Sequence, residues 1–158
     1  MPKEIIGVST KDTLRLWLRM LSLTNMVEGR LRQNLRTGYG VTLPRFDVMA
    51  ALHDKPEGSS MGEIAQRLLV TKGNVTAIVE PLEKEGLVHR QQRPEDRRSH
   101  IVRLTGAGRG AFETMARDLE GWIASMLSGL DEEEVEQLAQ LLGKAKQSIR
   151  STNGEERV

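Results

Sequence analysis

The sequence of 158 residues has no cysteine and few aromatic residues, namely Trp17, Tyr39, Phe46, Phe112 and Trp122. The absence of cysteine excludes a disulfide framework, a thiolate metal site and a cysteine redox switch. With so few aromatic side chains, we expect a core built mostly from Leu, Val, Ile, Met and Ala. The N-terminal stretch has no long apolar region, so we predict a cytoplasmic protein with no signal peptide, membrane span or membrane partner.

The residue constellations of enzymes are also missing. The three histidines, His53, His89 and His100, are far apart and lack the spacing of metal ligands. The glycine-rich run at residues 106–110 lacks the full phosphate-binding pattern and the lysine of a P-loop, so we interpret it as the loose start of a helix. No serine, lysine or carboxylate group is arranged as a catalytic triad or acid–base pair. We therefore predict no enzymatic activity, no metal and no cofactor.

What the sequence does have is an uneven distribution of charge. Residues 1–112 hold 18 Lys and Arg against 12 Asp and Glu, whereas residues 113–158 hold 5 against 10. The first part therefore carries a net charge of +6 and the second −5. Such a split suits a protein that meets a polyanion through one part. Solvated helix faces produce similar imbalances, so charge alone does not decide the function.

Long amphipathic helices are predicted at both ends of the chain. Near the N-terminus, apolar residues recur with nearly helical spacing at Leu14, Leu18, Leu21, Met26, Val27, Leu31 and Leu35. Leu43-Pro44 opens a second helix, Thr105 begins another, and the pair Asp131 and Glu134 has capping-box spacing before the last. These helices carry more apolar surface than the short central stretch can cover. We predict a homodimer that buries this surface; the alternative is a monomer whose helices wrap the centre.

The central stretch, residues 60–105, has the pattern of a helix-turn-helix. Ser60 and Glu63 have capping-box spacing, Thr71 is placed to cap a second helix, and Gly86 is placed to end it. The second helix of such a motif enters the DNA major groove. Its first turn carries the polar or small residues Thr71, Lys72, Gly73, Asn74 and Thr76, which are our candidates for base and phosphate contacts. Taken alone, they are better explained as good capping and surface residues.

A hairpin with an arginine-rich loop is predicted directly after this motif. Residues 87–90 and 101–104 form two strands in this prediction, and the loop between them contains Arg93, Asp96, Arg97, Arg98 and Ser99. An arginine at the tip of a hairpin suits the narrow minor groove, where the potential is most negative. We expect Asp96 to hold one arginine through a bidentate ion pair. A helix-turn-helix followed by such a hairpin indicates a winged helix.

The run TKGNVTAIVEPLEKEGLVHR, followed by RPEDRRSHIVRLTGAGR, resembles the winged-helix signature of the MarR transcriptional regulators. The resemblance extends over about residues 12–150, and the Asp-x-Arg wing with its trailing Leu-Thr is the most specific part. It implies a mainly α fold with a small β-hairpin wing, in a single domain covering residues 1–158. Residues 12–38 and 105–150 would be dimerisation helices, and residues 44–104 the winged helix-turn-helix.

The resemblance also implies a function and roles for particular residues. It predicts a homodimer that binds double-stranded DNA at a pseudo-palindromic operator, with the second helices in major grooves and the wings in minor grooves. Carried over, Arg98 would be the wing-tip arginine, Asp96 its brace, and Arg97 a neighbouring phosphate contact. We expect a repressor, because a dimer over a promoter blocks polymerase without further contacts. The alternative is a winged-helix module that binds protein partners without specific DNA binding.

Two features leave questions open. Pro81 lies inside the second helix of the motif, where its ring removes one hydrogen bond and predicts a kink. Relatives in the family also commonly bind small phenolic or anionic effectors between the dimer helices and the winged helix. The candidates for such a pocket are Arg15, Trp17, Arg19, Tyr39 and His53, each of which is also explained as a core or surface residue.

Overall fold

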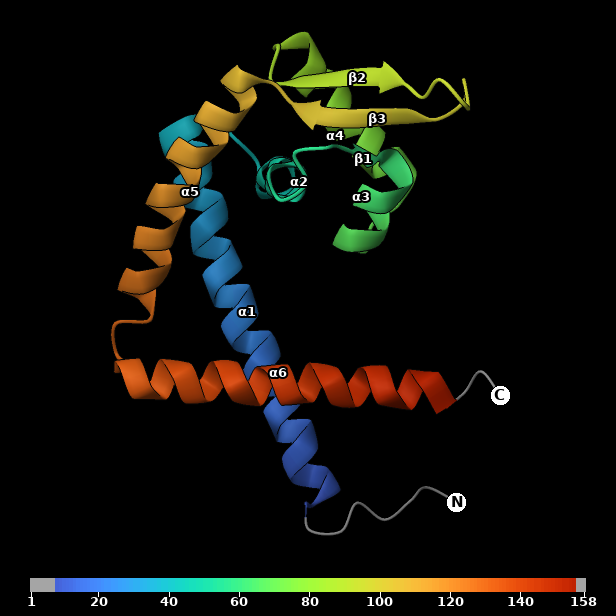
Figure 1. Ribbon diagram of the computed structural model, residues 1–158. Coiled ribbons are helices and arrows are strands. Elements are labelled where there is room, and N and C mark those ends of the chain that lie inside the picture. Colours follow the sequence, from blue (N-terminus) through green and yellow to red (C-terminus); the bar gives the residue numbers. More distant parts are fainter. Residues whose placement is uncertain (1–7, 156–158) are drawn as a thin grey trace. The chain divides into compact units, whose positions relative to one another are not determined.

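The computed structural model describes residues 8–155 of the chain, with the side chains of residues 8–152. Its elements are mainly helical and follow in the order shown in Figure 1. They are α1 (Thr10–Tyr39), α2 (Leu43–His53), β1 (Ser59–Ser60), α3 (Met61–Leu68), α4 (Lys72–Lys84), β2 (Val88–Gln92), β3 (His100–Leu104), α5 (Gly106–Met126) and α6 (Glu132–Glu155). The predicted fold class, mainly α with a small β wing, is confirmed.

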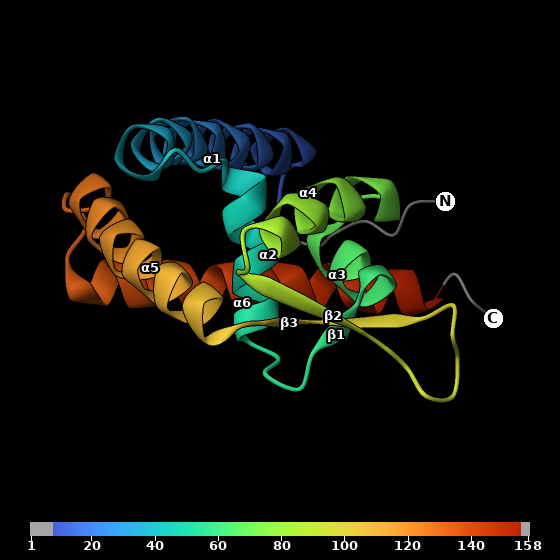
Figure 2. The same cartoon turned by 90° about the horizontal axis from the view of Figure 1, so that it is seen from above.

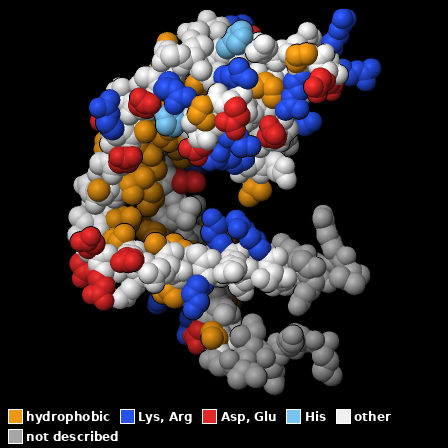
Figure 3. All heavy atoms as spheres, in the orientation of Figure 1, with side chains coloured by type: hydrophobic (Ala, Val, Ile, Leu, Met, Phe, Trp, Pro, Cys, Tyr) orange, Lys and Arg blue, Asp and Glu red, His pale blue; other side chains and the backbone are white. Residues whose placement is uncertain are grey.

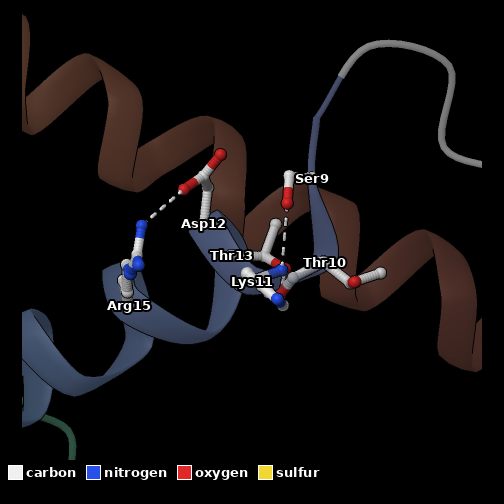
Figure 4. A network of polar contacts seen from close by, with 6 residues as sticks. All are labelled: Ser9, Thr10, Lys11, Asp12, Thr13 and Arg15. Carbon is white, nitrogen blue, oxygen red and sulfur yellow. Dashed lines mark hydrogen bonds and ion pairs between the residues drawn. The ribbon is translucent and has the colours of Figure 1, made fainter.

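Helix starts follow the capping residues of the sequence. At α3, the Ser60 N–H donates to Glu63 Oε2 at 2.7 Å and the Glu63 N–H donates to Ser60 Oγ at 3.1 Å, so the predicted capping box is formed. Asp131 and Glu134 make the same reciprocal pair before α6, with both distances 2.9 Å. At α1, the hydroxyl of Ser9 accepts from the Lys11 N–H, as Figure 4 shows.

The sheet has three antiparallel strands in the order β1-β3-β2, with β3 in the middle. In the hairpin, Val88 pairs with Leu104 and Gln92 with His100. The sequence predicted only this hairpin and missed β1, because a strand of two residues has no alternating pattern to detect. Through β1, the segment that enters α3 is joined to the wing, since Ser59 pairs with Val102.

The core of the winged helix lies where α2, α3 and α4 meet the sheet (Figures 1 and 2). Its fully buried apolar side chains are Val48, Met49, Leu52, Ile64, Val75, Val79, Leu82 and Val102, and Leu35 of α1 is buried to the same degree. Gly86 follows α4 with a φ of +73°, a left-handed conformation that glycine adopts without strain. The chain thereby turns from α4 into β2 as predicted.

Helix α5 begins at Gly106, so the glycine-rich run forms the start of a helix as interpreted from the sequence. Thr105 Oγ1 accepts from the Gly108 N–H at 3.0 Å and donates to the carbonyl oxygen of Gly86 at 2.7 Å. A Cβ added at Gly108 would overlap the carbonyl oxygen of Leu87. Glycine therefore lets the first turn of α5 approach the backbone that leads into β2.

The chain divides into two compact units, residues 1–121 and 122–158. The first contains the winged helix, α1 and most of α5. In the second, the described side chains of α6 are exposed, including the apolar Val135, Leu138, Leu141, Leu142 and Ile149. Among the described residues, no helix is both long and apolar enough to cross a membrane.

Candidate nucleic-acid interface

The first turn of α4 presents polar side chains outward from a buried base. Thr71 is the N-cap residue, and its Oγ1 accepts from the Asn74 N–H at 3.2 Å. Lys72, Gly73 and Asn74 are all exposed. The opposite face of the helix is held in the core by Val75, Val79 and Leu82. The packing of α4 therefore fixes which of its side chains are accessible to a ligand.

Two of the predicted contact residues have more limited roles than their neighbours. Thr76 is half-buried, and its hydroxyl donates to the Lys72 carbonyl oxygen at 3.0 Å, so it is left mainly as an acceptor. At Gly73, an added Cβ would meet only Thr71 Oγ1, at 3.9 Å. The fold therefore does not require glycine at position 73.

The loop between β2 and β3 is closed by hydrogen bonds of its own backbone. The Arg93 N–H donates to the Ser99 carbonyl oxygen, and the Ser99 N–H donates to the Asp96 carbonyl oxygen, both at 3.0 Å. Gln92 Nε2 adds a bond of 3.0 Å to the Arg97 carbonyl oxygen. The side chains of Arg93, Arg97 and Arg98 are left exposed, and Figure 3 shows Lys and Arg side chains gathered at the outer end of the hairpin.

Asp96 does not form the bidentate ion pair that we predicted. Its Oδ1 instead accepts from the backbone N–H of Arg98 at 3.0 Å. An aspartate two residues before an N–H closes this local bond at a small cost in side-chain entropy, which explains why it is preferred to a longer ion pair. Asp96 therefore fixes the backbone from which Arg98 projects and leaves the guanidinium group available.

A polar hollow of about 490 Å³ joins the start of α3, the start of α4 and the wing. Its lining residues are Ser60, Met61, Gly62, Lys72, Thr76, Arg90, Asp96, Arg98, Ser99 and His100. Arg90 is paired with Glu83, so the charges that remain in the lining are those of Lys72, Arg98 and Asp96, and this small positive excess favours an anion. Five of the predicted residues line it: Lys72, Thr76, Asp96, Arg98 and Ser99. The other five, Thr71, Gly73, Asn74, Arg93 and Arg97, lie outside it.

Arg90 lines this hollow and was missed by the sequence prediction. Its Nε donates to Glu83 Oε2 at 2.6 Å, and its second nitrogen reaches Glu83 Oε1 at 3.2 Å, which ties β2 to the end of α4. The hydrogen bond from Arg90 holds the pKa of Glu83 below its ordinary value. Arg90 shares the inward face of β2 with Val88, a place where the alternating pattern predicts an apolar residue, so its partner became visible only in the fold.

Pro81 does not end α4. The helix continues from Lys72 to Lys84 through the proline, whose side chain is exposed. The Glu85 N–H still donates to the Pro81 carbonyl oxygen at 3.0 Å. Because Pro81 follows the polar first turn by more than one helical turn, that turn keeps its regular hydrogen bonds.

The five residues proposed for an effector pocket do not come together within the chain. Trp17 precedes Tyr39 by 22 residues on one continuous helix, which places it about 33 Å away along the axis. Arg15, Trp17 and Arg19 are all exposed on the first half of α1. His53 Nε2 lies 3.1 Å from Glu113 Oε1, and its ring lies against Phe112 with centroids 4.8 Å apart. Residues that were grouped by their chemistry therefore lie far apart along the helix.

Tyr39, one of these five, lines a cavity of about 410 Å³ between α1, α2 and α5. Its hydroxyl hydrogen-bonds to Asp118, and this bond, with burial, raises the pKa of Tyr39. Arg45 lines the same cavity and forms a two-pronged ion pair with Glu85, in which one arm measures 2.9 Å. Within the described part of the chain, the buried Arg45 Nε has no hydrogen-bond partner. The cavity thus combines an apolar wall, including Met49 and Met115, with the polar side chains of Tyr39 and Arg45, which are bonded to Asp118 and Glu85.

Comparisons with known proteins agree on one family. The profile described as MarR family matches residues 39–99. The chain is 33% identical over 118 residues to an uncharacterized HTH-type transcriptional regulator, YkoM of Bacillus subtilis, and the match covers 75% of each protein. FabT of Streptococcus pneumoniae, solved in complex with DNA, has the same fold, with a TM-score of 0.72 at 22% identity over 89% of this chain and 99% of that chain.

A solved MarR family transcriptional regulator from Silicibacter pomeroyi matches more closely in sequence than FabT does. It is 30% identical, and the match covers 90% of this chain and 99% of that one with a TM-score of 0.74. Both the winged helix and the long flanking helices are included in a match of this extent. The chain therefore belongs to the MarR family of winged helix-turn-helix transcriptional regulators.

Proposed function

We propose that this protein is a sequence-specific DNA-binding regulator that acts as a homodimer on a pseudo-palindromic operator. The observation that carries the proposal is the hollow shared by α3, α4 and the wing, whose lining includes the cations Lys72 and Arg98 and the single carboxylate of Asp96. A phosphate backbone is the polyanion that such a surface binds. The relatives FabT and MepR, which share the fold, were both solved in complex with DNA.

In the proposed complex, the first turn of α4 enters the major groove. Asn74 and Lys72 are exposed there, and both side-chain types bond base edges or phosphates. The wing extends its arginines toward the adjacent minor groove, with Arg98 directed by the Asp96 bond. Winged-helix residues 44–104 would thus read DNA, while residues 12–38 and 105–150 would hold two copies at a fixed separation.

The first half of α1 supports dimerisation. Its exposed apolar side chains are Leu14, Leu16, Trp17, Leu18, Leu21, Leu23 and Met26, with 38–64% of their surface accessible. A shallow hollow lined by Leu18, Leu21, Ser22, Asn25 and Met26 runs along the same helix. An apolar stripe of this length is typical of a surface covered by another protein, and a second copy is the partner that the family resemblance implies.

Repression and release by an effector complete the proposal. A dimer bound over a promoter excludes polymerase sterically, so repression needs no further surface. The cavity that holds Tyr39 and Arg45 suits a small aromatic effector, because its wall is largely apolar and is bordered by a phenol and a guanidinium group. We expect the protein to act in the cytoplasm, where its operator is accessible.

Selection of a duplex from a random library, followed by footprinting, tests the central claim. We expect a protected pseudo-palindrome. We also expect a plot of the logarithm of the binding constant against the logarithm of the salt concentration to fall with a slope of roughly 0.9 for each phosphate neutralised. Analytical ultracentrifugation of the same sample measures the oligomeric state. Failure to bind any duplex at low salt would favour the protein-partner module, and a monomer at micromolar concentration would contradict the dimer.

Asn74→Ala distinguishes base reading from simple charge attraction. Asn74 is exposed beside the N-cap of α4, and an asparagine side chain pairs with adenine through two bonds. We expect operator affinity to fall by about 1–3 kcal/mol while affinity for random duplex changes little. Titration of both duplexes at one salt concentration measures the ratio. Equal losses would identify Asn74 as a phosphate contact.

A further inference from the structure

Leu69 lies at the turn between α3 and α4 in a conformation that its residue type rarely adopts. Its φ is +56°, and among the described residues it is the one non-glycine residue with a positive φ. Its side chain is also 91% exposed, more than that of any other large apolar residue in the described part of the chain. An exposed apolar side chain on a strained backbone contributes little to the fold.

The turn itself demands the left-handed conformation. The Leu69 N–H is directed at the carbonyl oxygens of Ala65 and Gln66, and the Val70 N–H donates to the Ala65 carbonyl oxygen at 3.0 Å. This pair of bonds closes the end of α3, and glycine is the residue that satisfies it without strain. Leucine is therefore the unfavourable choice for the turn, and its side chain needs another explanation.

The position of Leu69 supplies one. It precedes Thr71, the N-cap of α4, by two residues, so their Cα atoms are separated by at most about 7 Å. The residues that follow, Lys72 and Asn74, are the proposed groove contacts. A leucine side chain at this distance lies at the edge of the surface that meets DNA. An apolar group there has one specific partner in the major groove, the 5-methyl group of thymine.

We infer that Leu69 packs against the 5-methyl group of a thymine in each half-site and thereby makes the protein select that base. The inference rests on the proposed DNA-binding function and names a residue that reads sequence by shape and apolar contact. Hydrogen bonds from Asn74 and Lys72 would read the neighbouring base pairs. The strain at the turn is then the cost of presenting an apolar side chain to the groove.

Substitution of thymine by deoxyuridine in the selected operator removes the methyl group and nothing else. Loss of one buried methyl weakens binding by about fourfold, and loss of one in each half-site by about fifteenfold. We expect this effect at one symmetric thymine position for the wild-type protein. For Leu69→Gly and Leu69→Asn, we expect deoxyuridine and thymine operators to bind alike, and for Leu69→Met we expect the preference to return.

Thermal unfolding of the same variants provides an independent readout. Leu69→Gly and Leu69→Asn relieve the strain at a left-handed position, so we expect their Tm to rise by about 3 °C while operator affinity falls. A structural role would lower both stability and affinity. A higher Tm with lower affinity thus indicates a residue that contacts bases, whereas a fall in both indicates a residue that stabilises the turn.

Three outcomes would overturn the inference. If deoxyuridine at each thymine position left the affinity of the wild-type protein unchanged, a methyl contact would be excluded. A thymine preference that survives in Leu69→Gly would assign the methyl to another residue. If Leu69→Gly lost the same affinity for the operator, the deoxyuridine operator and random duplex, Leu69 would contact the sugar backbone instead. If the wild-type protein bound no duplex, the proposed function would fail as well, whereas the first three results leave that function intact.

Discussion

The two halves of α1 are both rich in leucine, but their leucines have opposite surroundings. In the second half, Leu31 and Leu35 are 7% and 0% exposed because the helix packs there against α2. In the first half, Leu14 and Leu18 are 58% and 52% exposed. A straight helix cannot fold back to cover its own apolar stripe. The second half therefore belongs to the core of the winged helix, and the first half gains from burial only against another surface.

The same division separates the core face of α4 from its exposed first turn. Val75, Val79 and Leu82 are inaccessible, whereas Lys72, Gly73 and Asn74 are exposed and make no contribution to the core. Exposed polar side chains such as those of Lys72 and Asn74 can be substituted without disturbing the core, whereas the buried side chains are constrained by their packing. The comparison predicts that core substitutions unfold the protein and that surface substitutions change binding alone.

The largest effect is expected from Leu35→Ala, with Leu18→Ala as the matched control on the same helix. Removing a fully buried leucine side chain costs about 2–5 kcal/mol, since the cavity left behind is only partly filled. The same substitution at Leu18 should change the unfolding free energy of the protomer little and weaken dimerisation instead. Chemical denaturation and sedimentation measure the two quantities. Equal destabilisation of the protomer by both variants would break the distinction between the halves.

The next largest effect is expected from Gly108→Ala, with Gly110→Ala as its control. A Cβ at Gly108 overlaps the Leu87 carbonyl oxygen, so we expect a loss of about 1–3 kcal/mol as α5 is displaced. At Gly110 an added Cβ has no atom within 4 Å, and alanine should stabilise the helix by up to about 1 kcal/mol. Thermal unfolding compares the two. If Gly108→Ala were as stable as the wild type, the close approach of α5 would be incorrect.

Arg98→Ala tests whether a wing side chain contributes to binding alone. We expect operator affinity to fall by about 1–3 kcal/mol, with Tm and dimerisation nearly unchanged, because the Asp96 bond goes to the backbone of residue 98 and survives the substitution. Arg30→Ala removes an exposed arginine from α1 and should leave operator affinity unchanged. A lower Tm for Arg98→Ala would assign this arginine to the fold.

The smallest effect concerns the Glu83–Arg90 pair at the join between α4 and the wing. Because the hydrogen bond from Arg90 lowers the pKa of Glu83, the pair stabilises the folded state above the ordinary glutamate pKa of about 4 and is lost as the pH falls further. Both side chains are about one third exposed, so Glu83→Gln should cost less than about 1 kcal/mol at pH 7. Unfolding free energies measured from pH 7 to pH 3 should converge for the two proteins, and a difference that grows on acidification would contradict the sign of the shift.

Much of the fold follows from local patterns in the sequence. The capping residues Ser60, Thr71 and Asp131 mark the starts of α3, α4 and α6, and Gly86 marks the end of the turn after α4. The membership of the MarR family confirms the predictions of a transcriptional regulator and of a protein that is not an enzyme. These predictions succeeded because capping and helical periodicity depend on residues within a few positions of one another.

The site was predicted less completely, since it joins segments that are distant in sequence. Lys72 and Arg98 belong to one hollow together with Arg90 and His100, which the sequence did not single out. The candidate effector residues stay a prediction, and the structure shows that Arg15, Trp17 and Arg19 are separated from Tyr39 along α1. Leu69 was overlooked because its exposure and its φ depend on how α3 meets α4.

The sequence by itself determined the helices, the turn between α3 and α4, the hairpin and the polar first turn of α4, since each depends on local propensity and capping. Only the tertiary structure decided how they combine. Pairing of β1 with β3 brings the start of α3 to the wing, and the backbone bond of Asp96 directs Arg98. The reason is physical: a local pattern specifies the conformation of one segment, whereas a binding surface depends on distances between segments that packing alone sets.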